Sequence, residues 1–215
     1  KGAFSVPVGT WTRVGGGLSG ERMRRQPQIT GKYIQQVESA CRQACYNAAN
    51  ATLAQMQGYH QQFTVLTQNI DGFHTDAGSR DVIEIHGNLH ELYCTVCEVG
   101  RKVSSYAGLN IPPACADCGG LLRPRVVLFG EMLPEPAMDR LHRLLEDGVD
   151  LVLTIGTTSV FPYIAAPVLR AVHSGVPTVE INPSVTEVSD QVSHRLAGRA
   201  AEVLPALLER VQGHY

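Results

Sequence analysis

The sequence lacks any long apolar run. None of its 215 residues belongs to a stretch near the roughly 20 apolar residues that a membrane-spanning helix needs. Its first residues also lack the charged and apolar blocks of a secretory signal peptide. We therefore expect a cytoplasmic protein that makes no contact with a membrane.

The sequence also lacks an excess of charge of either sign. The formal net charge is -2, so the charge balance gives no electrostatic preference for nucleic acid. No internal repeat is visible. The hydrophobic fraction of 44% is enough for a sizeable core, and the length fits one large domain with or without a smaller one attached.

Six cysteines are present, and four of them form two Cys-x-x-Cys motifs. Each motif offers two thiolates from one tight turn, and two such turns complete the tetrahedron that Zn²⁺ prefers. The separation of the motifs is typical of a zinc ribbon. We predict a structural zinc site formed by Cys94, Cys97, Cys115 and Cys118.

Two alternatives exist for these cysteines. The regular spacing argues against four buried thiols without a metal, and two copies flanking a polar loop argue against a redox motif. Because four thiolates already fill the tetrahedron, neither His86 nor His90 is needed as a ligand. The near-neutral charge and the few aromatic residues around the motifs disfavour a zinc ribbon that binds nucleic acid.

The apolar patterns change along the chain. Residues 1–31, rich in Gly and basic residues, predict a loop or a disordered stretch, and residues 32–57 predict a helix that stops at Gly58. Short β-branched runs then predict strands at 63–67, 82–85, 150–155 and 177–181. Helices are expected at 135–146 and 162–173 and near the C-terminus, which gives a βαβ pattern with a parallel sheet.

Polar residues follow these predicted strands. His86 follows one strand, Gln68, Asn69 and Asp71 follow another, and the small residues from Gly156 follow a third. Ligands of open parallel sheets bind beyond the carboxyl ends of the strands, so these ends predict a nucleotide crevice. An ordinary turn remains the alternative at each position, because such residues often end strands.

Six motifs together resemble the sirtuins, a family of NAD-dependent protein lysine deacylases. They are TQNIDGFHTDAG, IEIHG, the paired Cys-x-x-Cys motifs, RPRVVLFGEMLP, IGTTS and VEIN, and the resemblance runs from about Asn47 to the C-terminus. It implies an α/β fold: a Rossmann-like parallel sheet domain with a small module built from a zinc ribbon and helices. The expected parts are 1–46 (helical part of the small domain), 47–88 (first Rossmann-like part), 89–124 (zinc-ribbon insert) and 125–215 (second Rossmann-like part).

The resemblance also implies a reaction. Sirtuins transfer the acyl group of a protein lysine to the ADP-ribose of NAD, giving nicotinamide and O-acyl-ADP-ribose. His86 matches the general base, and an imidazole with a pKa near 6.5 suits that role. The residues that match NAD contacts are Gln68, Asn69, Ile70, Asp71, Gly156, Thr157, Thr158, Asn182 and Ala200.

A separate segment matches the site of the acylated peptide. Val127 and Phe129 would line the acyl-lysine tunnel, and Gly130 and Glu131 would lie on the strand that pairs with the peptide backbone. Sirtuins that prefer acidic acyl groups carry a Tyr and an Arg three residues apart in a small-domain helix, and no such pair occurs near YIQQVESACRQ. We expect acetyl or another uncharged acyl group.

One part of the family pattern is missing. Sirtuins open with a Gly-Ala-Gly-x-Ser phosphate loop. This sequence instead starts with residues that resemble the segment after that loop, and Trp11 stands where sirtuins often have a Leu-Trp pair. We expect a fragment without that loop and therefore with weaker NAD affinity. A module that binds only NAD or ADP-ribose, and an ADP-ribosyltransferase, are the alternative functions.

Overall fold

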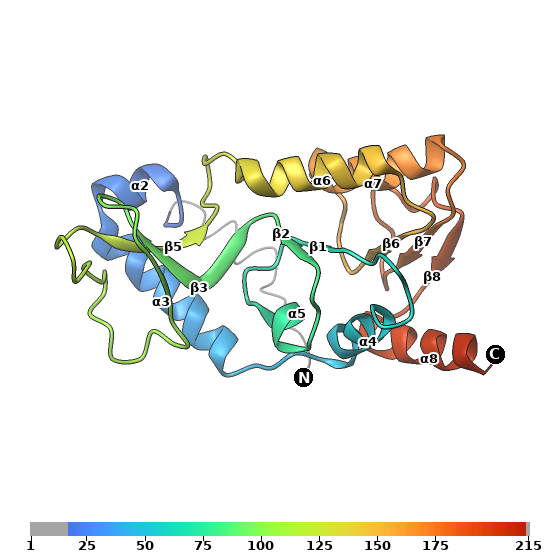
Figure 1. The fold of residues 1–215 in the computed structure, drawn as a ribbon, viewed down its shortest axis with the longest axis horizontal. Helices are drawn as coiled ribbons and strands as arrows, with labels where there is room; N and C mark the ends of the chain where they lie inside the picture. The colour runs from blue at the N-terminus through green and yellow to red at the C-terminus, as the bar shows by residue number, and fades with distance from the viewer. Residues whose placement is uncertain (1–16, 214–215) are drawn as a thin grey trace. The chain divides into compact units, whose positions relative to one another are not determined.

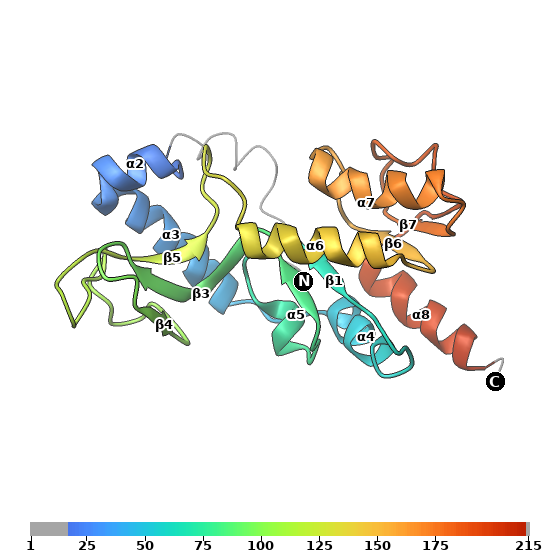
Figure 2. The same ribbon diagram turned by 45° about the horizontal axis from the view of Figure 1, so that its top comes forward.

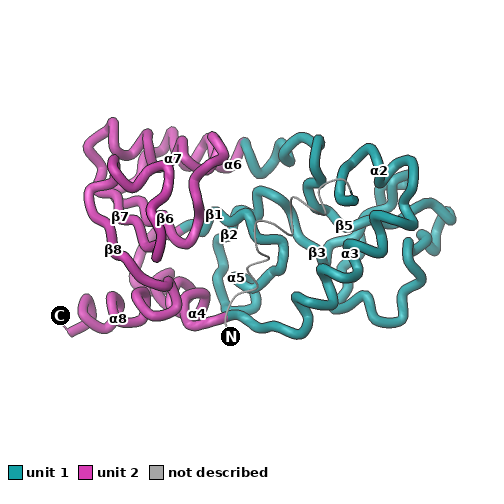
Figure 3. The backbone as a smooth tube through the Cα atoms, turned by 180° about the vertical axis from the view of Figure 1, so that it is seen from behind, with its two compact units in different colours: residues 1–46, 64–138 teal, residues 47–63, 139–215 magenta. Residues whose placement is uncertain are grey.

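A computed structural model describes residues 17–213 of the chain. The chain divides into two compact units (Figure 3): unit 1 contains residues 1–46 and 64–138, and unit 2 contains residues 47–63 and 139–215. The expectations about Trp11 and the start of the sequence lie outside the described residues. The division into four parts that the family resemblance implies stays a prediction.

Unit 1 contains a three-stranded antiparallel sheet covered by helices. The strands β3 (Gly87–Cys94), β4 (Gly100–Lys102) and β5 (Leu122–Val126) occur in the order β4-β3-β5, and α2 (Gly20–Arg25) and α3 (Pro27–Arg42) lie beside them (Figure 1). The shared core contains apolar side chains from both helices, the sheet and the adjoining loops: Leu18, Met23, Ile34, Cys41, Leu89, Leu92, Tyr106, Val126 and Leu128.

The predicted helix over 32–57 is confirmed for residues 32–42 and 48–56 but is interrupted between them, and the predicted loop for the described part of residues 1–31 is wrong. Ser19 caps α2 by accepting a hydrogen bond from the Arg22 N–H at 3.1 Å, and Pro27 occupies the first turn of α3, where its missing N–H costs nothing. The helix then ends at Arg42. A new one, α4 (Ala48–Met56), starts after Asn47, whose side chain accepts from two backbone N–H groups of its first turn.

Unit 1 also contains a parallel pair of strands. β1 (Val65–Thr67) and β2 (Val82–Glu84) pair with Val65 opposite Val82, and the short helix α5 (Phe73–Asp76) lies between them in sequence. Parallel pairing brings the carboxyl ends of both strands to one edge. The residues after Thr67 and those after Glu84 therefore share that edge, as the sequence predicted.

Unit 2 contains the βαβ arrangement expected from the sequence. The strands β6 (Val152–Ile155), β7 (Thr178–Ile181) and β8 (His194–Leu196) are parallel, and α7 (Pro162–His173) connects the first two. α7 and α6 (Glu135–Asp147) confirm the two predicted helices, whereas β8 was not predicted.

A second helical layer completes unit 2. α4 and α8 (Ala200–Gln212) lie side by side (Figure 2), and their apolar side chains meet β7 in a small core of Ala49, Leu53, Ile181 and Leu204. None of the helices within residues 17–213 combines the length and the apolar character that a membrane crossing requires.

Candidate functional site

The four cysteines of the paired motifs come together in unit 1. Their sulfur atoms all lie within 4.8 Å of one another, with the Sγ atoms of Cys94 and Cys118 3.4 Å apart and those of Cys97 and Cys115 3.7 Å apart. Ligands about 2.3 Å from a tetrahedral zinc ion are separated by about 3.8 Å. The four thiols are therefore placed to hold one metal ion.

Backbone groups favour the thiolate form at Cys94; at Cys97 the Val99 N–H acts in the same direction, but hydrogen bonds with Cys118, Cys94 and Cys115 and burial raise the pKa to about 12. The N–H groups of Cys97 and Val96 lower the pKa of the Cys94 thiol to about 6, although burial opposes them. The Gly120 N–H points to the Cys118 sulfur at 3.4 Å. Thiolates are the form that binds zinc, so the donor set fits this ion. His90 belongs to a different environment, where its Nε2 lies 4.0 Å from Oε1 of the buried Glu38.

His86 lies in the turn between β2 and β3, next to the end of β1. Its Nδ1 is 3.1 Å from the carbonyl oxygen of Gln68. A carbonyl oxygen can only accept a hydrogen bond, so Nδ1 carries the proton of the neutral ring and Nε2 presents a lone pair. Burial lowers the pKa of His86, and the Gln68 carbonyl opposes this shift. The ring is therefore neutral near pH 7, as a general base must be.

The loop after β1 presents the other polar residues of this edge. Asn69 is exposed, and its N–H donates to the Thr67 hydroxyl at 3.1 Å. Asp71 is only 9% exposed; its Oδ1 accepts from the Phe73 N–H at 3.0 Å. Burial raises the pKa of Asp71, although that hydrogen bond opposes the shift. Ile70 packs against the core of unit 1, which holds the loop in place.

The segment from Val127 to Glu131 follows β5 and touches the turn of His86. The Val127 N–H donates to the His86 carbonyl oxygen at 2.9 Å. Phe129 is 49% exposed, and Gly130 is also exposed, with a φ of 80°. The predicted substrate segment and the predicted base are thus neighbours within unit 1.

Glu131 has a structural partner that the sequence did not indicate. Its carboxylate accepts from the Arg123 guanidinium at 2.6 and 3.0 Å and from the Leu128 N–H at 2.9 Å. Burial alone would raise the pKa of Glu131, but the Arg123 side chain and the Leu128 N–H hold it below its ordinary value. The carboxylate therefore fixes the turn of the segment.

The predicted contacts in unit 2 gather at the ends of β6 and β7. Gly156 has a φ of 62°, a conformation that favours glycine, and its N–H donates to the Ile181 carbonyl at 3.0 Å. The Asn182 amide donates to the Thr157 carbonyl at 2.9 Å and accepts from the Ser184 N–H at 3.0 Å. One side chain thus ties the two loops together.

Two predicted residues lie at the margin of this group. The Thr158 carbonyl accepts from the Glu187 N–H at 3.4 Å. Ala200 is the first residue of α8 and packs against the core of unit 2. The structure thus sorts the predicted NAD residues into two groups, one from Gln68 to Asp71 in unit 1 and one in unit 2.

Comparison with known proteins identifies the family of this chain. The model of the Sir2 family matches residues 12–162. The NAD-dependent protein deacylase 2 of Pseudomonas aeruginosa is 47% identical over 198 residues, which cover 90% of this chain and 77% of that protein. This chain belongs to the Sir2 family.

Solved sirtuin structures share its fold. A Sir2 homologue in complex with NAD is 32% identical and superposes with a TM-score of 0.88, covering 99% of this chain and 83% of that one. Sir2Tm bound to a propionylated peptide is 29% identical, with a TM-score of 0.80 and a coverage of 90% and 83%. The Rossmann-like sirtuin fold is thereby confirmed.

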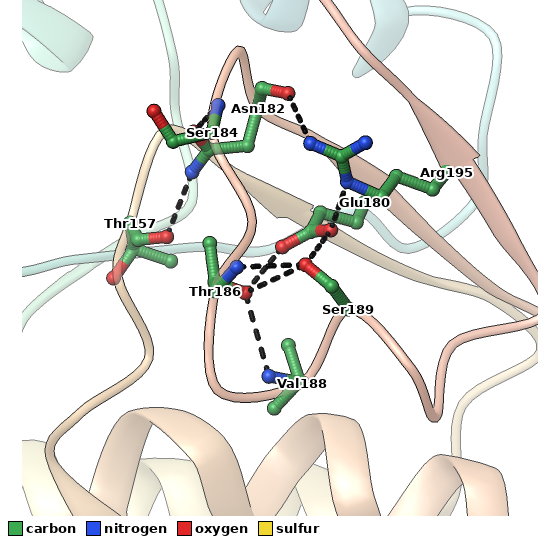
Figure 4. A network of polar contacts seen from close by, with 8 residues as sticks. All are labelled: Thr157, Glu180, Asn182, Ser184, Thr186, Val188, Ser189 and Arg195. Carbon is green, nitrogen blue, oxygen red and sulfur yellow. Dashed lines mark hydrogen bonds and ion pairs between the residues drawn. The ribbon is translucent and has the colours of Figure 1, made fainter.

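The sequence reasoning missed a buried polar network in this sirtuin. Glu180 in β7 is 1% exposed, and Figure 4 shows its carboxylate facing the hydroxyls of Thr186 and Ser189 and the guanidinium of Arg195. The Ser189 hydroxyl donates at 2.5 Å and the Arg195 Nε at 3.0 Å. A charged residue inside the apolar run PTVEI was the available signal, because a buried carboxylate requires partners.

The Glu180 network reaches the predicted NAD residues of the sirtuin. Nη2 of Arg195 donates to the Asn182 carbonyl at 3.4 Å, and Asn182 in turn holds the Thr157 carbonyl (Figure 4). Glu180 therefore connects the loop after β7, the start of β8 and the loop after β6. It stabilises the arrangement of this edge of the sheet.

Replacing Glu180 with glutamine is expected to lower the free energy of unfolding by roughly 2 to 3 kcal/mol. The amide keeps the volume but leaves the charge of Arg195 without its carboxylate, and breaking a buried ion pair on one side is costly. Chemical denaturation measures the change. The matched control is Glu187→Gln in the same loop, where the side chain is exposed. An equal loss in both variants would contradict the role of the network.

Proposed function

We propose that this chain removes acetyl or similar uncharged acyl groups from protein lysine in an NAD-dependent reaction, giving nicotinamide and O-acyl-ADP-ribose. Membership of the Sir2 family and the similarity to NAD-dependent protein deacylases support the reaction type. One observation carries the assignment to this chain: the Nδ1 of His86 is bound to the Gln68 carbonyl beside the segment that begins at Val127.

In this proposal His86 is the general base. Its neutral ring has the lone pair on Nε2, and this atom takes a proton from a ribose hydroxyl of NAD. The Gln68 carbonyl fixes both the tautomer and the ring orientation. Burial keeps the base unprotonated to lower pH than for a histidine in water.

The two groups of NAD residues serve different parts of the cosubstrate. Gln68, Asn69, Ile70 and Asp71 would contact the nicotinamide end, where an amide and a carboxyl group pair with a carboxamide. Gly156, Thr157, Thr158, Asn182 and Ala200 would contact the phosphate and adenosine end. The Asn182 amide keeps one N–H and one lone pair beyond its two protein contacts, which suffices for a ribose hydroxyl.

The acylated peptide would bind along residues 127–131. Val127 and the exposed Phe129 provide apolar surface for the lysine stem, and the exposed backbone at Gly130 can pair with a peptide strand. A related sirtuin structure contains a propionylated peptide, which supports this class of substrate. Cys94, Cys97, Cys115 and Cys118 would hold zinc, which contributes shape and stability rather than chemistry. A cytoplasmic location stays a prediction.

A product assay tests the proposal. The purified protein is incubated with an acetyl-lysine peptide and NAD, and mass spectrometry follows the peptide and the nucleotide. We expect deacetylated peptide and O-acetyl-ADP-ribose in equal amounts, and none without NAD. ADP-ribose attached to the peptide would indicate a transferase instead. Tight NAD binding without either product would indicate a binding module.

A further inference from the structure

A pocket rich in arginine lies against the proposed substrate segment in unit 1. It has a volume of about 610 Å³ and is lined by Ser19, Glu21, Arg24, Arg25, Phe129 and Gly130. A smaller pocket of about 350 Å³ shares Ser19, Glu21 and Arg25 and adds Arg22 and Gln26. We call the two together the arginine pocket. No motif of the sequence assigned any role to α2, from which its arginines come.

The contact between α2 and the substrate segment is fixed by backbone pairing. The Phe129 N–H donates to the Leu18 carbonyl at 3.0 Å, and the Phe129 carbonyl accepts from the Gly20 N–H at 3.1 Å. A side chain at Gly20 would place its Cβ 2.5 Å from Cγ of Glu131, so any other residue would have to displace the Glu131 side chain. Because Arg123 in turn holds Glu131, the segment and the start of α2 form one rigid edge.

The arginine pocket carries a surplus of positive charge. Its lining contains three arginines, Arg22, Arg24 and Arg25, and one carboxylate, that of Glu21. Glu21 forms an ion pair with Arg25 at 3.1 Å. The carboxylate of Glu131 is nearby, but the Arg123 guanidinium already neutralises it. The two pockets together therefore have a net formal charge of +2, and the larger one, which Phe129 and Gly130 line, has a net charge of +1.

We propose that the arginine pocket selects acylated peptides with acidic residues close to the acyl-lysine. This inference rests on the proposed deacylase function. In an extended peptide, side chains on one face recur every 6.6 to 7 Å, roughly two residues apart. A peptide paired with the backbone at Gly130 would run past the arginine pocket, which Gly130 lines, so side chains two or three positions from the lysine would reach Arg24 and Arg25. A guanidinium there binds a carboxylate and repels a lysine.

Two acetyl-lysine peptides test the inference. They share one sequence except for the residues two and three positions on either side of the acetyl-lysine, which are glutamate in one and lysine in the other. We expect a KM about 5- to 10-fold lower for the acidic peptide with a kcat within about twofold, as exposed ion pairs allow. The difference should shrink as NaCl rises from about 0.05 to 0.5 M, because salt screens exposed charges.

Reversing the charge of two arginines on α2 tests whether they cause the preference for the acidic peptide. The double variant Arg24→Glu and Arg25→Glu should invert the preference, so that the lysine peptide has the lower KM. The control is Arg143→Glu, an exposed arginine on α6 that does not line the pocket and should keep the wild-type preference. A preference that survives in the double variant would overturn the assignment to α2.

The outcomes separate this inference from the proposed function. Equal KM values for the two peptides would overturn the acidic preference while deacylation itself stands. If neither peptide is turned over, the proposed function fails, and peptide binding measured by fluorescence anisotropy still decides the charge preference. A lysine peptide that binds as tightly as the acidic one in that measurement also overturns it.

Discussion

Replacing His86 with alanine is expected to lower kcat for deacetylation at least 100-fold. A positioned general base contributes about 10²- to 10⁴-fold, and the Gln68 carbonyl fixes the orientation of the His86 ring, the proposed base. Steady-state rates with an acetyl-lysine peptide measure the loss. The matched control is His142→Ala on α6, where the histidine is exposed and lies on a helix outside the described site. Turnover by His86→Ala within a few-fold of wild type would remove His86 as the base.

The pH profile gives a second reading of the same residue. Burial lowers the pKa of His86 below its ordinary value of 6.5, and the opposing hydrogen bond to Gln68 does not reverse the shift. The active form is the neutral ring, so kcat/KM should fall on the acid side with an apparent pKa below 6.5 and stay level through pH 7. An acid-side decrease in kcat/KM with an apparent pKa above 6.5 would contradict the assignment of this decrease to His86. In the His86→Ala variant, the remaining activity should no longer show this acid-side decrease in kcat/KM.

The sequence predicted those parts of this sirtuin that depend on local pattern. α7 starts at Pro162 and ends before Gly175, and both residues mark helix boundaries in the sequence itself. The four cysteines meet because each motif forms its own turn. The polar ends of β1 and β2 share an edge because the two strands are parallel. In each case, the information lies in short motifs or in segments close together in the sequence.

Other features depend on residues that are far apart in the sequence. One exception is local: the predicted helix over 32–57 ends at Arg42, and a second helix starts after Asn47, whose side chain caps it by accepting from the Ala49 and Asn50 N–H groups. The pairing of Leu18 with Phe129 and the ion pair of Glu180 with Arg195 arise only when distant segments meet. Both bring charged side chains next to loops that contain predicted site residues. Tertiary contacts therefore add the arginine pocket and the Glu180 network to a site whose motif residues were visible in the sequence.

Removing zinc is expected to unfold the ribbon between β3 and β5. The apolar cluster there contains only Cys94, Cys115 and Leu122, with Val99 packed against it. So small a core does not stabilise a fold without a metal. Structural zinc in comparable small sites contributes about 10 to 16 kcal/mol at pH 7. A chelator should therefore abolish the protection of β4 and its neighbouring turns against hydrogen exchange, and metal analysis before treatment should give one zinc per chain.

A pair of cysteine variants separates metal binding from general loss of a thiol. Cys118→Ser removes one ligand and should lower both the zinc content and the melting temperature. Cys45→Ser removes an exposed thiol outside the cluster and should change neither. The segment 127–131 follows β5 directly, so loss of the ribbon should also raise KM for the peptide. A metal-free protein with an unchanged melting temperature would show that the four thiols stabilise the ribbon without zinc.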